Sequence, residues 1–271
     1  MQINKTIPLL LILLIAQAML MAQDVNLRIS DSGSDQLRVA VVAIDAEVQS
    51  PDNQRLEYVM SNVLRYDLDF SPFFMSIDTT LFPQRSISDE SDIDFFQWSE
   101  AGAQFIIYGT FRQKKEDLYL NIEVFSILDS KRIYEHEYKG DPRQSRRIIH
   151  HIADDIVKLL TGEDGIAQTQ IVFVSNRSGQ KEIFISDYDG FGTRQITAHK
   201  SLALAPDFSP NGDKILFTSY ASGNPDMYVY DVYKTTAEKV ASYPGLNIQG
   251  AFSPDGRKIA LELTKDGNSE I

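Results

Sequence analysis

The sequence predicts an α+β amino-terminal domain followed by an incomplete all-β propeller of four-stranded blades. The main observation is a repeat: Phe-Ser-Pro-Asn-Gly beginning at Phe208 returns as Phe-Ser-Pro-Asp-Gly beginning at Phe252, 44 residues later. A repeat of about 40–45 residues that contains several short β-rich runs is typical of a propeller blade. The second observation is that the chain before residue 165 lacks this repeat and combines apolar strand-like runs with two amphipathic helices.

Further residues of the same type recur at the 44-residue offset. They are Ile171, Ile215 and Ile259; Asp187 and Asp231; and Gly179, Gly223 and Gly267. Within the repeat, Ser209-Pro-Asn-Gly212 has the composition of a type I turn, because proline presets φ at its second position and glycine suits its fourth. β-rich runs follow the turn, including residues 238–241 as a plausible last strand. Each repeat therefore predicts four short strands.

The repeats give about two and a half blades over residues 166–271. Ile271 aligns with Met227, which is in the middle of a strand, and the first repeat lacks the Phe-Ser-Pro strand ahead of Ile171. Because propellers close with roughly 4–8 blades, we expect the chain to belong to a longer protein whose later residues complete the ring. An open set of blades exposes sheet edges, so we expect low stability for this part alone.

The composition excludes some classes of function. The chain has 271 residues, room for two domains, and its net charge is −12, or −13 without a leader that contains only Lys5. This balance argues against a nucleic-acid surface and is compatible with basic protein partners. The absence of cysteine excludes disulfides, thiolate metal sites and a lipid anchor on cysteine.

Residues 1–22 have the pattern of a secretory signal peptide. Lys5 precedes an apolar run and small residues, and cleavage after Ala18 or after Ala22 fits the pattern. A membrane anchor is the alternative, although the apolar run is shorter than the roughly 20 residues of a bilayer span.

Residues 24–35 follow as a short β-like segment and a polar stretch. Val25, Leu27 and Ile29 alternate with Asn26 and Arg28. Such a terminal segment is an edge strand or a frayed end, or a strand that a partner recruits.

The remainder of the predicted domain at residues 23–165 alternates strands with helices. Strand-like runs occur at residues 38–44, 73–77, 105–111, 118–124 and 131–138. One helix opens at Ser50 with Pro51 at its first position, a short helix at residues 92–102 carries Trp98 as a core residue, and a long helix occupies residues 143–160. Gly162 is the expected C-cap of the long helix, and the glycine-marked stretch up to residue 165 is the expected domain boundary.

No pattern of catalytic, cofactor-binding or metal-ligating residues emerges. The chain lacks a Gly-x-Ser-x-Gly elbow, a His-Glu-x-x-His motif and a phosphate-binding loop. The most metal-like cluster is formed by His150, His151, Asp154 and Asp155, which we interpret as a solvated helix face because further ligands are lacking. Asp187-x-Asp189-Gly190 resembles the start of a calcium loop but lacks the acidic residue at its twelfth position, which favours a turn.

The order of these parts resembles the TolB family of periplasmic propeller proteins of the Tol–Pal system in Gram-negative bacteria. The resemblance extends from about residue 24 to the end. It is carried by the segment from Asp24 to Gly33, by Leu160-Thr-Gly162 at the domain junction, by Ser186-Asp-Tyr-Asp-Gly190 and by the Phe-Ser-Pro repeats.

The resemblance implies a non-enzymatic scaffold. In the family the propeller binds the outer-membrane lipoprotein Pal, the amino-terminal segment switches between docking on the protein and reaching TolA, and the system supports envelope integrity and cell division. Carried over, residues 24–35 would be the switching segment, with Val25, Leu27, Arg28 and Ile29 as TolA-binding residues. The Pal-facing surface would include the loop at residues 245–250.

Within that loop, Leu246, Asn247 and Gln249 are the expected partner-binding residues. The loop departs from the family pattern, since Leu246 stands where relatives carry histidine and Gln249 replaces a small residue. An ordinary connection between blades is the alternative. We expect no cofactor, no nucleic acid, membrane association only through partners such as other envelope proteins, and a periplasmic location.

Two other functions remain open. Serine oligopeptidases carry similar propellers beside an α/β-hydrolase domain, and a nucleophile could lie beyond Ile271. The order of domains and the missing elbow argue against this alternative. A sugar- or metal-binding propeller, for instance one that binds calcium, is the third possibility.

Overall fold

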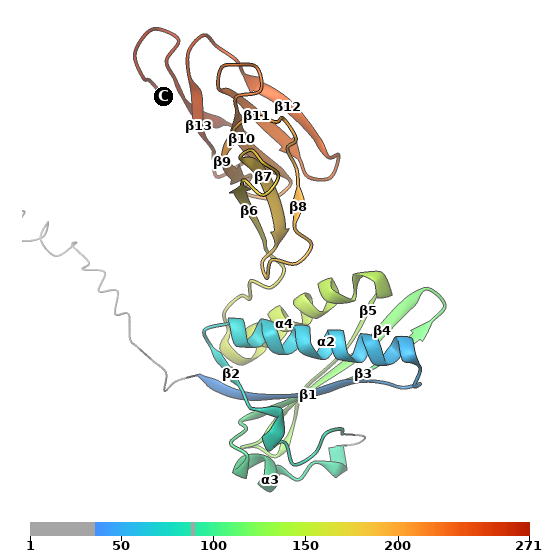
Figure 1. Ribbon diagram of the computed structural model, residues 1–271. Helices are drawn as coiled ribbons and strands as arrows, with labels where there is room; N and C mark the ends of the chain where they lie inside the picture. Colours follow the sequence, from blue (N-terminus) through green and yellow to red (C-terminus); the bar gives the residue numbers. More distant parts are fainter. Residues whose placement is uncertain (1–35, 88–89) are drawn as a thin grey trace, which may run out of the picture. The chain divides into compact units, whose positions relative to one another are not determined.

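A five-stranded sheet organises the first half of the described chain. The computed structural model describes residues 36–87 and 90–271 (Figure 1). The strands are β1 (Leu37–Ala46), β2 (Phe74–Ser76), β3 (Phe105–Lys114), β4 (Asp117–Ser126) and β5 (Lys131–Gly140). Their order is β2-β1-β3-β4-β5, with β1 parallel to β2 and β3, and β3, β4 and β5 antiparallel. The five predicted strands are thus confirmed, whereas the predicted signal peptide lies outside the described residues.

Two long helices cover one face of this sheet. They are α2 (Pro51–Phe70) and α4 (Ser145–Thr161), and α3 (Phe95–Glu100) lies on the opposite face (Figure 1). Short 3-10 helices are η1 (Thr79–Leu81), η2 (Glu90–Asp92) and η3 (Pro142–Gln144). The predicted caps are confirmed: the Ser50 hydroxyl accepts from the Asn53 N–H at 3.1 Å, and Gly162 ends α4 at a φ of 80°.

The short helix is narrower than predicted. Its bounds were expected at residues 92–102, but α3 begins after Asp94, whose carboxylate accepts from the Gln97 N–H at 3.1 Å. Gly102 follows with a φ of 86° and leaves the helical conformation. Trp98 is fully buried as predicted, and its Nε1 donates to Gln84 at 3.3 Å.

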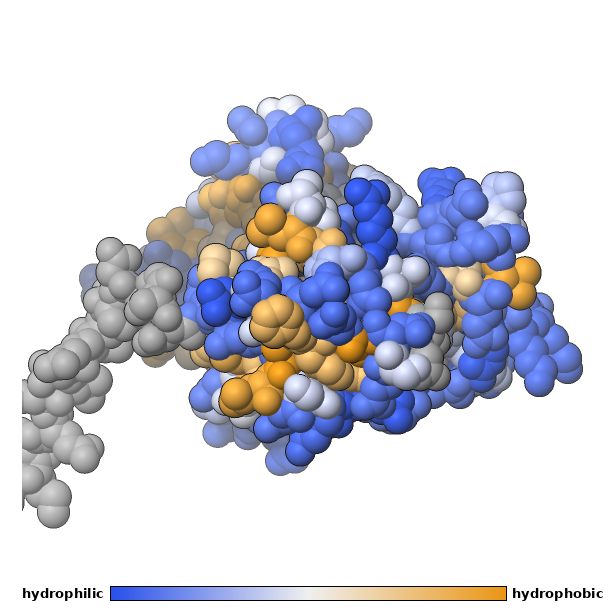
Figure 2. Space-filling view, turned by 90° about the horizontal axis from the view of Figure 1, so that it is seen from below, coloured by the Kyte–Doolittle hydropathy of each residue, from blue (hydrophilic) through white to orange (hydrophobic). Residues whose placement is uncertain are grey.

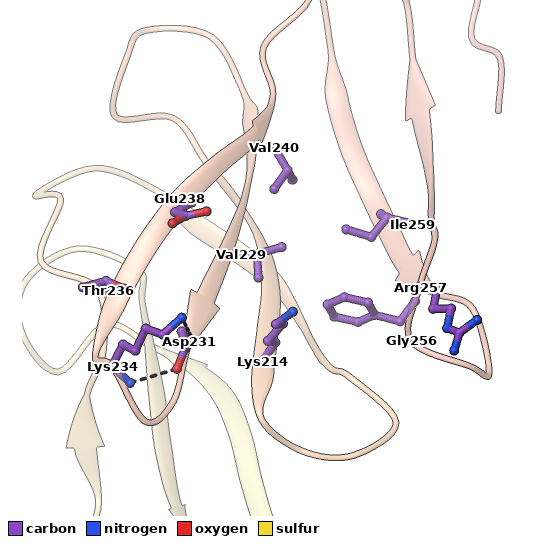
Figure 3. Close-up of a pocket in the computed structure, with 11 residues that line it drawn as sticks. Lys214, Val229, Asp231, Lys234, Thr236, Glu238, Val240, Gly256, Arg257 and Ile259 are labelled. Carbon is purple, nitrogen blue, oxygen red and sulfur yellow. Dashed lines mark hydrogen bonds and ion pairs between the residues drawn. The ribbon is translucent and has the colours of Figure 1, made fainter.

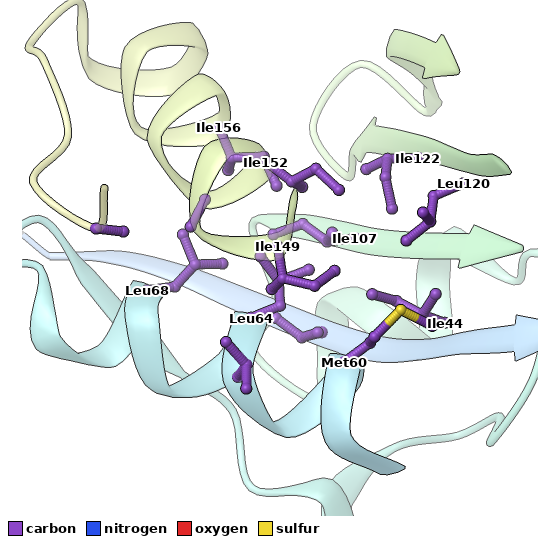
Figure 4. Packing of buried hydrophobic residues seen from close by; sticks show 14 of the residues in the cluster. Ile44, Met60, Leu64, Leu68, Ile107, Leu120, Ile122, Ile149, Ile152 and Ile156 are labelled. Atoms are coloured by element: carbon purple, nitrogen blue, oxygen red, sulfur yellow. The ribbon is translucent and has the colours of Figure 1, made fainter. Parts of the chain in front are cut away.

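The sheet separates two apolar cores, which explains its dense aliphatic sequence. Val39 and Val41 of β1 pack with α2 and α4, whereas Ala40 and Val42 pack on the other face with Trp98. Figure 4 shows the larger core, in which Leu64 and Leu68 of α2 meet aliphatic residues of α4 and the strands. A strand buried on both faces reads as a continuous apolar run, because neither side faces water.

The second half of the chain consists of small antiparallel sheets. The first contains β6 (Gln170–Ser175), β7 (Glu182–Asp187) and β8 (Arg194–Gln195). The second contains β9 (Ala203–Phe208), β10 (Lys214–Ser219), β11 (Asp226–Asp231) and β12 (Thr236–Ala241). The third contains β13 (Asn247–Phe252) and β14 (Ile259–Leu263). The second sheet is a four-stranded blade, and the three sheets form an incomplete propeller.

The predicted turns recur in the structure at the 44-residue offset. The Gly212 N–H donates to the Ser209 carbonyl at 2.8 Å, and Gly256 and Ser253 make the same bond at 2.8 Å. In each turn the serine hydroxyl also accepts from the N–H of the residue five positions on, Lys214 at 2.9 Å and Lys258 at 3.0 Å. The same side chains therefore close the same hairpin in two sheets.

The outer surface is mixed in polarity. Figure 2 shows one face on which apolar residues gather in patches between hydrophilic ones. Among the described helices, none combines the length and the apolar character that a membrane crossing would require.

Candidate partner-binding surfaces

The expected TolA-binding residues cannot be placed. Val25, Leu27, Arg28 and Ile29 lie outside the described residues, which begin at Gln36. Their role stays a prediction.

The stretch at residues 245–250 differs from the expected loop. Gly245 turns the chain with a φ of 85°, and β13 already begins at Asn247 and pairs with β14. Leu246 is 39 % exposed, and its N–H donates to the Thr264 hydroxyl at 2.8 Å. Most of the predicted Pal-facing stretch is therefore strand. Leu246 presents an apolar side chain just before β13 begins.

Asn247 has a different position from that expected of a contact residue. It is fully buried, its Nδ2 donates to the carbonyls of Tyr243 at 2.8 Å and Pro225 at 3.1 Å, and its Oδ1 accepts from the Tyr243 N–H at 2.9 Å. A buried amide that satisfies backbone groups fixes the local chain path. Asn247 thus holds the turn in place and has no surface with which to touch a partner.

Gln249 is exposed and adopts an unusual backbone conformation. Its φ is 52°, and Ala205, one repeat earlier, has a φ of 50°. At both places the pairing with the neighbouring strand shifts in register. Positive φ in residues other than glycine costs free energy and gathers at functional positions. The positive φ at these two positions was not predicted from the sequence. The only indication of it is that Ala205 and Gln249 align with each other just ahead of the Phe-Ser-Pro motif.

A pocket of about 340 Å³ lies between the second and third sheets (Figure 3). Val229 and Val240 of one sheet and Ile259 of the other supply its apolar walls. Charged groups surround them, among them Lys234, whose ammonium lies 3.2 Å from Asp231. The pocket has mixed polarity, and its acidic and basic groups suit contact with a peptide or protein surface.

A second hollow, of about 760 Å³, is lined by residues of α3, β1 and the turn between β4 and β5. Two of its apolar side chains are strongly exposed, Phe96 at 73 % and Leu128 at 94 %. Gathered exposed apolar groups mark surfaces for protein contact.

The four residues of the predicted cluster on α4, His150, His151, Asp154 and Asp155, do not share one solvated face. His151 is exposed and lies 3.7 Å from Asp155, but the Asp154 carboxylate accepts from the N–H groups of Ala167 at 2.7 Å and Gln168 at 3.1 Å. His150 is only 4 % exposed. The interpretation as a solvated face is therefore wrong for His150, because this residue turns toward the interior.

A buried network connects His150 to the first sheet of the propeller. The Asp67 carboxylate of α2 accepts from the Tyr188 hydroxyl at 2.5 Å, and its other oxygen lies 2.7 Å from His150 Nδ1. Burial, and then the hydrogen bond to Asp67, raise the pKa of Tyr188 well above its usual value. No sequence pattern indicated this network, because 121 residues separate Asp67 from Tyr188.

The turn after β7 makes a second connection to α4. Arg146 pairs with Asp189 and lies over the Phe191 ring at 4.0 Å. The turn itself is confirmed, since the Gly190 N–H donates to the Asp187 carbonyl at 2.9 Å.

One serine–histidine pair bears on the question of an enzyme. Ser219 Oγ lies 2.7 Å from His199 Nδ1. Ser219 is fully buried, and its hydroxyl also accepts from the Ala221 N–H at 3.3 Å. A nucleophile must reach its substrate, so this pair is a structural contact.

An α+β domain followed by an incomplete propeller places the chain among two-part propeller proteins. Two family models match in that order: the TolB amino-terminal domain over residues 25–133 and the TolB beta propeller domain over residues 157–271. The chain belongs to the TolB family.

Curated relatives agree with this assignment. The Tol-Pal system protein TolB of Geobacter metallireducens is 34 % identical over 206 residues, which cover 76 % of this chain and 48 % of the relative. The Tol-Pal system protein TolB of Geobacter sulfurreducens is 33 % identical over 216 residues, which cover 79 % and 49 %. The chain spans about half the length of these relatives.

A solved structure shows the same fold. The crystal structure of TolB from Acinetobacter baumannii matches with a TM-score of 0.74 and 21 % identity, over 87 % of this chain and 57 % of that one.

Proposed function

We propose that the protein is a periplasmic scaffold of a Tol–Pal system, which binds the lipoprotein Pal through the propeller and TolA through residues 24–35. The observation that carries the proposal is the match of both TolB domain models in their order, together with relatives named Tol-Pal system protein TolB. Its role is in outer-membrane integrity and cell division rather than in catalysis. The stretch from Gly162 to Gly165 joins its two domains.

Several features of the described surface support a binding role. Leu246 and Gln249 lie exposed at the start of β13, and the neighbouring pocket between sheets combines aliphatic walls with charged groups. The signal-peptide pattern at residues 1–22 supports export, and the net charge of −12 suits basic partner surfaces.

The amino-terminal part of the proposal is tested by deletion. The chain beginning at residue 23 and a variant beginning at Gln36 are compared for binding to purified Pal and purified TolA. We expect loss of TolA binding and an altered affinity for Pal in the shorter chain, because the recruited strand is gone. Unchanged affinities for both partners would refute the switching role.

The propeller part is tested at β13 with a control one repeat away. Leu246→Ala and Gln249→Ala should weaken Pal binding. Leu202→Ala is the matched control, because Leu202 lies 44 residues before Leu246 and is 38 % exposed, against 39 % for Leu246. Equal effects of Leu202→Ala and Leu246→Ala would show that this strand is not the specific contact.

A further inference from the structure

Three possible metal ligands converge between α4 and the turn after β7. One ligand atom from each of His150, Asp187 and Asp189 lies within 4.8 Å of the other two. His150 comes from the helix, and the two aspartates come from the turn that begins at the end of β7. No sequence pattern indicated that these residues share a site, because 37 residues separate His150 from Asp187.

The imidazole of His150 is oriented for this role. Its Nδ1 faces the buried Asp67 carboxylate at 2.7 Å, and that carboxylate also accepts from Tyr188. With the proton on Nδ1 donated to Asp67, the lone pair of the neutral ring is on Nε2. A carboxylate behind the histidine is the usual support of a metal-ligating imidazole.

The other nitrogen of His150 is the observation that points to a ligand. Nε2 is buried and has no hydrogen-bond partner among the described residues. A buried polar atom without a partner is costly, and native proteins usually satisfy it. His150 and Asp187 both line a hollow of about 680 Å³.

The two carboxylates are partly engaged. Gln170 donates to Asp187 Oδ1 at 3.3 Å, and the Phe191 N–H donates to Asp189 Oδ1 at 2.9 Å. Arg146 pairs with Asp189 Oδ2. Each carboxylate oxygen has a second lone pair, but the Arg146 charge competes directly with any cation at this place.

We propose that His150, Asp187 and Asp189 form a site for a divalent transition-metal ion such as Zn²⁺. An imidazole with two carboxylates suits Zn²⁺ better than Ca²⁺, which prefers oxygen ligands alone. Three protein ligands leave one position of a tetrahedral ion for water. The bound ion cross-links α4 to the turn after β7 and stabilises their contact.

The test is a zinc titration of the chain beginning at residue 23, purified without a histidine tag and treated with chelator. Calorimetry should show one Zn²⁺ per chain and weak or absent binding of Ca²⁺. His150→Gln and Asp187→Asn should each weaken Zn²⁺ binding by roughly tenfold or more, because loss of an outer-shell partner alone typically costs about 10–100-fold in metal affinity. Arg146→Met should strengthen it, since the competing charge is removed.

His151→Gln is the matched control on the same helix. His151 is exposed and pairs with Asp155, so its loss should leave the zinc affinity unchanged. Circular dichroism without metal separates loss of the site from loss of the fold, and Asp187→Asn carries the test if His150→Gln fails to fold. The proposal is overturned if the parent chain binds no zinc, or if zinc binding depends on His151 and not on His150 and Asp187.

Discussion

Gln249 and Ala205 show how one strained position recurs in a repeated strand. Both have positive φ, which glycine adopts without cost and a β-branched residue adopts poorly. We expect Gln249→Gly to be at least as stable as the parent chain and Gln249→Val to lose about 1–3 kcal/mol of unfolding free energy. Urea unfolding measures both values.

Ala251→Gly controls for the general effect of glycine. Ala251 lies in the same strand, is exposed and does not have positive φ. Here glycine should lower stability by roughly 0.5–1 kcal/mol. If Gln249→Gly lowers the unfolding free energy as much as Ala251→Gly does, the positive φ at Gln249 does not cost measurable free energy.

Asp226 is a buried carboxylate at the start of β11. Burial raises its pKa, but hydrogen bonds from Lys239, at 2.6 Å, and from Ser222 and Ser242 outweigh this effect and lower the pKa overall. We expect Lys239→Met to cost about 1–2 kcal/mol at pH 7, because the buried charge loses its main partner. Urea unfolding across pH checks this.

The pH dependence has a definite sign. A lowered folded pKa stabilises the protein above the unfolded value of about 3.9, and this stabilisation disappears as the pH falls through the folded pKa. The difference between the parent and Lys239→Met should therefore shrink below pH about 4. Lys234→Met is the control: Lys234 is 77 % exposed, so its pair with Asp231 should contribute little. Equal losses in both variants would contradict a special role for Asp226.

At the scale of elements, the link between α4 and β6 depends on a close approach at Gly165. A Cβ added there would lie 2.1 Å from Asp154 Oδ1 and 2.7 Å from its Cα. Gly165→Ala should displace Asp154 from the N–H groups of Ala167 and Gln168 and cost about 1–3 kcal/mol. Thermal unfolding measures the loss.

Asp154→Asn tests the cause of that loss. It keeps the size of the side chain and weakens its bonds to the link, so a smaller loss in the same direction is expected. If Gly165→Ala leaves the thermal stability unchanged, the chain between α4 and β6 can shift to accommodate the added methyl group without a loss of free energy.

Sequence patterns predicted the elements well and their contacts less well. The Phe-Ser-Pro turns, the Ser50 cap and the Gly162 cap follow from local chemistry, so residues near each other in the chain determined them. The burial of Asn247 was not predictable, because Pro225, one of its partners, lies in the turn before β11, in another part of the fold. Convergence of His150 with the turn after β7 likewise depends on packing between distant segments.

At the scale of the whole molecule, Tyr188→Phe tests the buried connection between α2 and the first sheet. The variant leaves Asp67 with one partner fewer, and we expect a loss of about 1–3 kcal/mol at pH 7. Because the folded pKa of Tyr188 is raised, its stabilisation is complete below the unfolded value and declines as the pH rises above about 10. Unfolding measured from pH 7 to 11 should show the difference from the parent shrinking in that range.

Tyr66→Phe provides the control, since Tyr66 lies one position before Asp67 on the same helix and is 49 % exposed. Its hydroxyl removal should be close to neutral. A Tyr188→Phe variant as stable as Tyr66→Phe would mean that the buried bond contributes nothing.

The bond between Tyr188 and Asp67 also has a consequence for biosynthesis. The ribosome synthesises α2 long before Tyr188, because Tyr188 follows Asp67 by 121 residues. Until then the Asp67 carboxylate lacks this hydrogen bond. A nascent chain that ends at Gly165 should therefore be cleaved more readily by protease around α2 than one that ends at Lys200. The first sheet of the propeller would then complete the stabilisation of the domain that is synthesised before it.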